Sequence, residues 1–364
     1  MKKLIQESTS KYIIGFIGVI ALVFSSFTLS AEGAEHGEKE KGFDAGEMIF
    51  EHILDAHEWH IMTIGEHHIS IPLPVIIYDK EEGGLHMFMS SHLAHGHEYE
   101  GYKLVKKDSK SKSRIVRAST GSGEGILDFS ITKTVFAIFI SVALMLWMFI
   151  SIANSYKKRK DQAPKGLQSF MEPLILFIRD DVAKPAIGKD YMRFMPYLLT
   201  IFFFIFINNI VGIIPIFPGG SNVNGNIGVT FVMATLTFII TSFNGTKDYW
   251  MHIINMPGVP WWLKFPLPLM PIVEIVGVLT KPIVLMIRLF ANILAGHIVI
   301  LGFMAMIFIF ANLFGAVAGY GVSVVSVGFT IFLSLLEILV AFIQAYVFTL
   351  LSALYFGMAM EKHH

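Results

Sequence analysis

Two very long apolar segments, residues 265–312 and 322–360, dominate the second half of the chain. As a helix, the second segment alone would be about 58 Å long, whereas the hydrocarbon core of a bilayer is about 30 Å thick. Four upright spans would need a polar turn near the middle of each segment, and Gly302 is the only break in either one. The sequence therefore predicts two long, strongly tilted membrane helices joined by a turn at residues 315–321.

Charged residues are scarce, and the scarcity is concentrated in this half of the chain. They make up 15% of all residues and hydrophobic residues 54%, whereas a soluble domain typically has about 25% charged residues. We therefore predict an all-α polytopic membrane protein with lipid around it and no nucleic-acid partner. There is no cysteine, which excludes disulfides and thiolate chemistry. The charged residues between positions 194 and 360 are Lys247, Asp248, Lys264, Glu274, Lys281, Arg288 and Glu337.

Shorter apolar segments predict upright spans before the two long helices. Residues 131–152 form the first span, and the basic run at 157–160 that follows it belongs on the cytoplasmic side. Residues 194–217 then cross outward and residues 229–243 return. This order places the C-terminus in the cytoplasm.

An amphipathic helix is expected over residues 167–182, between the first two spans. Phe170, Leu174, Phe177 and Ile178 follow one another at helical spacing, and Asp181 ends this apolar stripe. We expect the helix to lie on the cytoplasmic membrane surface.

The first 128 residues differ from the rest of the chain. Residues 1–31 have a basic start, an apolar stretch and small residues near Ala31, which indicates a secretory signal peptide, with an uncleaved membrane anchor as the alternative. Residues 32–128 are expected to form an extracytoplasmic, histidine-rich extension, and residues 129–364 the membrane domain. Within the extension, residues 68–78 and 85–89 favour short β-strands, and residues 109–125 have the composition of a polar linker.

Ten of the 14 histidines lie in this extension. The spacings His57-x-x-His60 and His92-x-x-His95-x-His97 would suit zinc or copper, since imidazole is a ligand for both metals. No cysteine and no helical metal-binding motif accompanies them, so a solvated polar surface is the favoured interpretation. We predict neither a metal site nor a cofactor.

A polar stripe runs along the first of the two long helices. Glu274, Lys281 and Arg288 are seven positions apart, so at about 100° per residue they fall within about 40° of one line. Asn292 joins this face, and His297 points to roughly the opposite side. The small residues Ala291 and Ala295 lie beside the stripe and would let a neighbouring helix approach closely. On the second long helix, Glu337 and Gln344 form a similar stripe.

Arg288 is the most demanding of these residues. An arginine near the middle of a membrane costs about 2.5–3.5 kcal/mol on insertion scales, and its side chain does not deprotonate. It persists either for a structural ion pair, with Glu274 or Glu337, or for function. Glu274 and Lys281 have a simpler alternative, because their side chains would reach the cytoplasmic interface.

The segment Lys281-Pro-Ile-Val-Leu-Met-Ile-Arg-Leu-Phe-Ala-Asn-Ile-Leu-Ala-Gly-His297 closely resembles the signature of subunit a of bacterial F-type ATP synthases. Asn208-Asn-Ile-Val-Gly212 supports the resemblance, as do Glu337 and Gln344. The resemblance extends from about residue 131 to the C-terminus, so it implies nothing for residues 32–128. It implies a stator subunit that is not an enzyme by itself and that works with the c-ring, the b subunits and the remaining subunits of the synthase.

The resemblance also implies roles for individual residues. Arg288 matches the essential arginine that keeps the passing c-ring carboxylate ionised and prevents proton leakage between two half-channels. Four further residues match positions along the outer half-channel: Asn292, His297, Glu337 and Gln344. Together with Glu274 and Lys281, these four residues form the expected proton pathway.

Two other classes of function remain as alternatives. One is a secondary transporter with its own substrate site, which would show repeated halves. The other is a metal sensor or metal-delivery module built on the histidine-rich extension. Only the stator subunit predicts a c-ring that copurifies in stoichiometric amount.

Overall fold

The structure is a computed structural model, and it describes residues 44–64, 67–81, 83–105, 113–158, 162–214, 219–254 and 269–361. All of these residues belong to one unit of the fold, Asp44–His364. The expected signal peptide, residues 1–31, lies outside the described residues.

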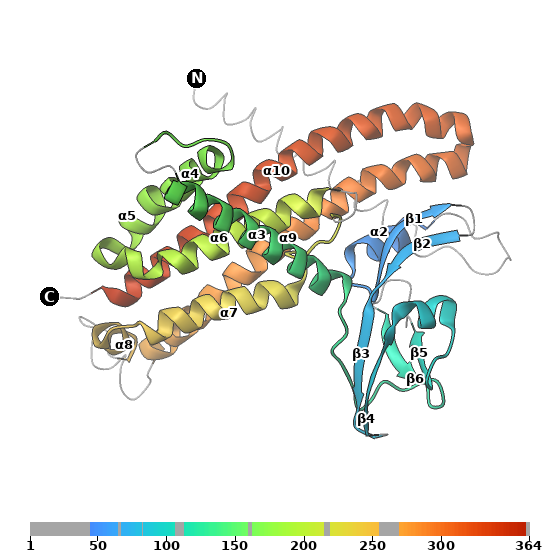
Figure 1. Cartoon of the computed structure of the whole chain (residues 1–364), viewed down its shortest axis with the longest axis horizontal. Coiled ribbons are helices and arrows are strands. Elements are labelled where there is room, and N and C mark those ends of the chain that lie inside the picture. The colour runs from blue at the N-terminus through green and yellow to red at the C-terminus, as the bar shows by residue number, and fades with distance from the viewer. Residues whose placement is uncertain are drawn as a thin grey trace. The chain divides into compact units, whose positions relative to one another are not determined.

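The described residues up to Ser130 form a small module of short strands, which we call the N-terminal module (Figure 1). The strands predicted around residues 68–78 and 85–89 are present as β2, β3 and β4. All pairs are antiparallel: β1 with β2, β3 with both β4 and β7, and β5 with β6. The elements are α2 (Ala45–Ile53), β1 (Glu58–Ile64), β2 (His67–Pro72), β3 (Pro74–Asp79), β4 (Gly84–Met89), the 3-10 helix η1 (Ser90–Gly96), β5 (Tyr102–Val105), β6 (Arg114–Arg117) and β7 (Ile126–Asp128).

The linker expected at residues 109–125 is wrong in part, because β6 lies within it. Its short sequence Arg-Ile-Val-Arg looks polar, yet Ile115 and Val116 are buried. Arg117 is buried as well and forms an ion pair with Asp79, which is fully buried in β3. A buried charge needs such a partner, and no local pattern in residues 109–125 reveals that the partner comes from β3.

The remainder of the described chain is helical, as predicted. Five helical segments among the described residues are long and apolar enough to cross a membrane: Lys133–Lys158, Leu167–Ile213, Ile227–Asn244, Ile272–Phe314 and Ala316–Met360. The helices are α3 (Lys133–Lys158), α4 (Leu167–Phe177), the π-helical turn η2 (Ile178–Ala183), α5 (Lys184–Ile187), the 3-10 turn η3 (Gly188–Asp190), α6 (Tyr191–Ile213), α7 (Ile227–Phe243), α8 (Lys247–Ile254), α9 (Leu269–Phe314) and α10 (Ala316–Met360).

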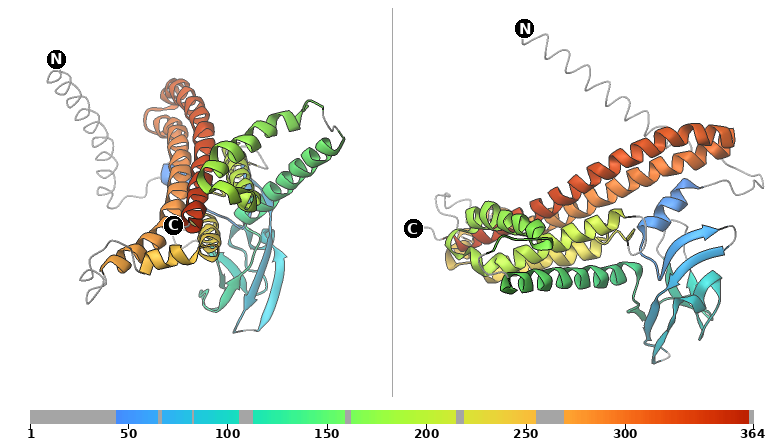
Figure 2. Two further views of the ribbon diagram at one scale, coloured as in Figure 1. Left: turned by 90° about the vertical axis from the view of Figure 1, so that its left-hand side faces the viewer. Right: turned by 45° about the horizontal axis from the view of Figure 1, so that its top comes forward.

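The two long helices are present, and they lie side by side as a hairpin in all three views (Figures 1 and 2). α9 has 46 residues and α10 has 45. At about 1.5 Å per residue each is close to 70 Å long, about twice the thickness of a bilayer core, so neither fits upright within it. α9 continues through Gly302 without a break.

The predicted turn at residues 315–321 is much shorter than expected. Only Gly315 leaves the helical conformation, with a φ of +86° that favours glycine. Gly319 and Gly321 are already part of α10. A Cβ on Gly319 would come within 2.7 Å of the Ala311 Cβ, so this glycine allows the two helices to approach closely instead of reversing the chain.

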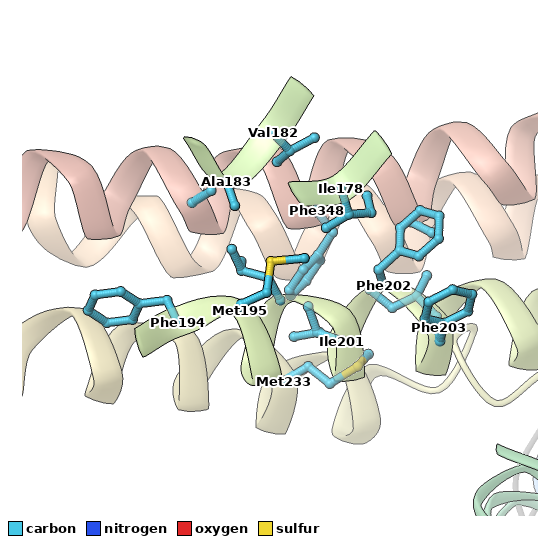
Figure 3. Packing of buried hydrophobic residues seen from close by; sticks show 14 of the residues in the cluster. Ile178, Val182, Ala183, Phe194, Met195, Ile201, Phe202, Phe203, Met233 and Phe348 are labelled. Atoms are coloured by element: carbon cyan, nitrogen blue, oxygen red, sulfur yellow. The ribbon is translucent and has the colours of Figure 1, made fainter. Parts of the chain in front are cut away.

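The apolar stripe expected over residues 167–182 faces partly into the protein core and partly outward. Ile178 is fully buried, but Phe170 is 63% exposed, and Gln168 and Met171 take its place on the buried face. Figure 3 shows Ile178 and Val182 of η2 meeting side chains of α6 and α10, which form the main core of the protein. Packing against these helices, and not the sequence pattern alone, decides which face is buried.

Candidate functional site

α9 turns a polar stripe away from the protein core. Arg288 and Asn292 are exposed, together with Ala291 and Ala295 beside them. The opposite face of the same turns packs into the core through the almost completely buried side chains of Leu285, Leu289 and Ile293. Arg288, Asn292 and the neighbouring alanines therefore share one face of α9, as expected, and this face is not covered by other described parts of the protein.

Arg288 forms no ion pair with any residue that the structure describes. Glu274 and Glu337 are both described, so neither is the structural partner that the sequence left open. Tyr355 of α10 is close enough to Arg288 for the two groups to interact electrostatically. A guanidinium on an exposed membrane face without a carboxylate is costly.

His297 and Glu337 lie next to each other across the α9–α10 interface. The His297 Nδ1 and Glu337 Oε1 atoms are 3.7 Å apart, and the Glu337 side chain is 6% exposed. Gly296 makes room for the carboxylate, because a Cβ at this position would lie 3.0 Å from Glu337 Oε1. Two titratable groups from different helices thus lie together at one place in the structure.

The Glu337 carboxylate is incompletely satisfied. Neither of its oxygens has a hydrogen-bond partner among the described residues. A buried hydrogen-bond acceptor without a partner lowers the stability of the fold unless water reaches it. Gln344, two turns further along α10, is also buried and lies on the same side of the helix.

A network of asparagines adjoins this site, and sequence analysis did not assign it a role. Asn209 of α6 donates to the Ala341 carbonyl of α10 over 3.4 Å, and Asn224 donates to the Asn209 side-chain oxygen over 2.7 Å. Beside them, the Ser141 hydroxyl donates to Asn208 over 2.7 Å. The only sequence signal was two consecutive asparagines in an apolar segment.

Gly212 connects this network to the histidine. A Cβ at Gly212 would lie 3.3 Å from the Ser221 carbonyl and 3.8 Å from His297 Nε2. The end of α6, the loop before α7, and both long helices therefore meet around His297. Polar groups from four segments converge at this end of the membrane domain.

A second polar group lies on the other side of Arg288 along α9. Lys281 Nζ lies 5.6 Å from the centre of the Tyr355 ring, and it is close enough to Glu274 for their charges to interact. Between these residues and α7 is a cavity with room for about one water molecule. Its polar lining comes from Thr237, Thr241, Tyr249, Lys281 and Tyr355.

Arg288 lies between the two polar groups. Lys281 is seven residues before it and His297 nine residues after it, about 10 Å and about 14 Å along the helix axis. The buried side chains of Leu285, Leu289 and Ile293 separate the groups within the core. Two polar regions therefore lie at different positions along the axis of α9, and the Arg288 guanidinium lies between them.

The histidines of the N-terminal module have other contacts. The His57 ring is hydrogen-bonded to Asp128 over 2.9 Å, and the His92 ring packs on Tyr99. Within the described residues, no three histidine, aspartate or glutamate side chains come together as a metal site would require. The His60 side chain, which the alternative metal-site hypothesis paired with His57, is outside the described side chains.

Models of known protein families match most of the chain. The family model described as ATP synthase A chain matches residues 135–357. A second model, described as a domain of unknown function (DUF8433), matches residues 48–129.

Individual relatives agree with the family match. The ATP synthase subunit a of Chlorobium phaeobacteroides is 36% identical over 91% of this chain and 80% of its own length. That of Chloroherpeton thalassium is 44% identical over 66% of this chain and 70% of its own length. That of Myxococcus xanthus is 40% identical over 67% and 78%. The chain therefore belongs to the ATP synthase subunit a family, the non-catalytic, multi-pass membrane subunit of the bacterial F-type ATP synthase.

Proposed function

We propose that this chain forms the stator side of the proton path, in which two offset half-channels meet a rotating c-ring at Arg288. The observation that supports this most directly is that Arg288 is exposed on a face of α9 lined with alanines and forms no ion pair with any described residue. Family membership favours this role over a secondary transporter with its own substrate site, because relatives along the whole membrane domain are named as ATP synthase subunits.

Arg288 is the residue that couples proton transfer to rotation. A cation within about 4–6 Å lowers the pKa of a carboxylate by about 1–3 units. A c-ring carboxylate that passes Arg288 therefore releases its proton and stays ionised until it leaves. Because arginine does not deprotonate, it cannot relay the proton itself, and it blocks direct leakage between the half-channels.

The outer half-channel is formed by His297, Glu337, Gln344 and Asn292. The carboxylate of Glu337 and the imidazole of His297 are adjacent and both titrate, so they would pass a proton toward the open face of α9. The unsatisfied oxygens of Glu337 fit a water-filled path. Asn292 is exposed beside Arg288 and is placed where the path would reach the ring.

The inner half-channel begins at Glu274 and Lys281. These two residues and the small cavity next to Lys281 lie on the opposite side of Arg288 from His297. Their position toward the predicted cytoplasmic end of α9 suits proton release into the cell. We further propose that a signal peptide, residues 1–31, and an extracytoplasmic extension, residues 32–128, precede the membrane domain, residues 129–364, and that the b subunits contact this domain.

Replacement of Arg288 tests the central claim. We expect Arg288→Ala to abolish proton-driven ATP synthesis in inverted vesicles while passive proton conductance, measured after the catalytic head is removed, stays the same or rises. Arg288→Lys should also fail, because a lysine between lipid and the c-ring, away from water, can deprotonate and lacks the planar guanidinium. The control is Ile287→Ala, a truncation of an exposed apolar neighbour. Near-normal synthesis by Arg288→Ala would refute the assigned role.

A further inference from the structure

One face of the β4–β3–β7 sheet in the N-terminal module is apolar and uncovered. Strands β3 and β4 are in register, so Tyr78 lies opposite Leu85, and Ile76 opposite Met87. Leu127 of β7 pairs with Tyr78 from the other side. We call this surface the open sheet face. Its residues are Ile76, Tyr78, Leu85, Met87, Met89, Leu127 and Phe129; Leu85 is 62%, Met87 65% and Phe129 63% exposed.

The opposite face of the same sheet is the core of the module. Val75 and Ile77 of β3 and Phe88 of β4 are buried against Leu93 and Tyr102. A sheet with water on one side normally alternates apolar and polar residues along each strand. This sheet is apolar on both faces, so one of its faces needs a cover that the module does not provide.

The open sheet face is tied to the start of the first membrane helix. The Phe129 N–H donates to the Ile76 carbonyl over 2.8 Å, and the Ile131 N–H donates to the Pro74 carbonyl over 3.0 Å. α3 begins at Lys133, whose N–H donates to the Ala56 carbonyl over 2.9 Å. The residues between β7 and α3 extend at most about 14 Å, so the sheet lies close to the membrane surface.

The module is also packed against the membrane helices, which limits how it can turn. Trp59 of β1 lies edge-on to Phe136 of α3, with their ring centres 5.9 Å apart, and forms a small buried cluster with Ala137 and Val223. The Asp55 carboxylate accepts a hydrogen bond from the Thr134 N–H. In Figure 1, β5 and β6 pack on the side of β3 and β4 that is turned away from α3, so the open sheet face is on the other side.

We propose that the open sheet face rests on the lipid surface of the leaflet at the Lys133 end of α3. Phe129 is exposed and precedes the start of α3 by four residues, and on α3 itself Phe139 and Trp147 are exposed in the manner of lipid-facing side chains. Tyr78 and Phe129 are residue types that suit the membrane interface. The module thus lies on one leaflet of the membrane without crossing it, and it orients the first membrane helix. This proposal requires only that α3 crosses the membrane, and it is independent of the proposed proton path.

The test uses the absence of native cysteine. Single cysteines replace Leu85 or Met87 on the open sheet face, and Arg114 on the exposed side of β6 serves as the matched control. Each full-length variant carries a fluorescent label and is studied twice in phosphatidylcholine vesicles, as the isolated subunit and within the whole ATP synthase. Quenching by brominated phosphatidylcholine reports lipid contact, and quenching by iodide reports contact with water.

We expect brominated lipid to quench the labels at positions 85 and 87 severalfold more than the label at position 114, with iodide giving the reverse order in both preparations. Equal iodide quenching at all three positions would place the sheet in water and overturn the proposal. Labels at 85 and 87 that are shielded from both quenchers only in the whole synthase would show that another subunit covers the face, which also overturns it. ATP synthesis by each labelled complex confirms that the variants fold.

Discussion

Gly296 determines where the Glu337 carboxylate lies. A methyl group at position 296 would be 3.0 Å from Oε1 and 3.5 Å from Cδ of Glu337. The carboxylate would therefore have to move, and its 3.7 Å approach to His297 would change. The absence of a side chain at position 296 therefore helps to position the carboxylate of the proposed relay, besides allowing α9 and α10 to pack closely.

We predict that Gly296→Ala lowers proton flux severalfold while the subunit still assembles. Alanine is itself a better helix former by about 0.5–1 kcal/mol, so a loss of α9 is not the expected cause. Passive proton conductance in stripped vesicles measures the effect. Gly302→Ala is the control on the same helix, because no atom lies within 4 Å of the Cβ it would add. Equal flux in the two variants would show that the carboxylate position is unimportant.

Asp128 links β7 to the buried His57 at the base of the module. Burial raises the pKa of the Asp128 carboxyl, but hydrogen bonds from His57 and Ser130 outweigh it and hold the pKa well below its usual value. A lowered pKa in the folded state stabilises the fold above the unfolded pKa of about 3.9, and this contribution is lost as pH falls toward the folded pKa.

We therefore predict that the module loses stability as the pH falls below about 4, and that Asp128→Asn reduces this pH dependence. Amide hydrogen exchange of residues 74–79 and 126–130 in the purified synthase, corrected for the intrinsic effect of pH, measures it. Asp44→Asn is a suitable control, because Asp44 caps α2 and does not contact His57. An unchanged pH profile in Asp128→Asn would contradict the assignment.

At the scale of elements, glycine and small residues control how closely the helices pack. Gly357 of α10 faces the backbone of α5, and a Cβ there would overlap the Ala186 carbonyl oxygen. A backbone carbonyl cannot rotate away as a side chain can. The α5–α10 contact therefore requires glycine at this position.

We predict that Gly357→Ala destabilises the subunit by about 1–3 kcal/mol, the usual range for overpacking. The expected result is less assembled synthase in the membrane and a lower unfolding temperature of the purified complex. Gly328→Ala, in an open position of the same helix, should have neither effect. If both variants assemble like the wild type, the close contact between α5 and α10 is not needed.

For the whole molecule, the order of spans sets which groups face which compartment. Residues 157–193 contain nine basic and five acidic residues, an excess that favours the cytoplasmic side. This excess predicts that α3 carries the N-terminal module on the opposite side, together with the His297–Glu337 site.

Cysteine labelling tests this orientation. A membrane-impermeant maleimide applied to intact spheroplasts should modify Glu98→Cys in the N-terminal module, and it should modify Lys158→Cys only after the membrane is permeabilised. Both positions are exposed, so accessibility within the protein is matched. Modification of position 158 from outside would reverse the topology and, with it, the outer and inner half-channels.

Much of this architecture is determined by local sequence. Long apolar segments with isolated charges are sufficient to predict membrane helices. The reason is that a charged side chain in lipid is costly whatever the tertiary structure around it. The seven-residue spacing along α9 places Arg288 on the face of Asn292 through helix geometry alone. The segment from Lys281 to His297 also identifies the family without any tertiary contact.

Contacts between distant segments required the tertiary structure. That Arg288 has no carboxylate partner among the described residues, and that His297 meets Glu337, depends on how α9 and α10 cross. The same is true of Arg117 and Asp79, whose pairing turns an expected linker into β6. Helical and strand periodicities repeat over a few residues, so they specify the face on which a side chain lies; what that face packs against is decided by the register between elements far apart in the chain.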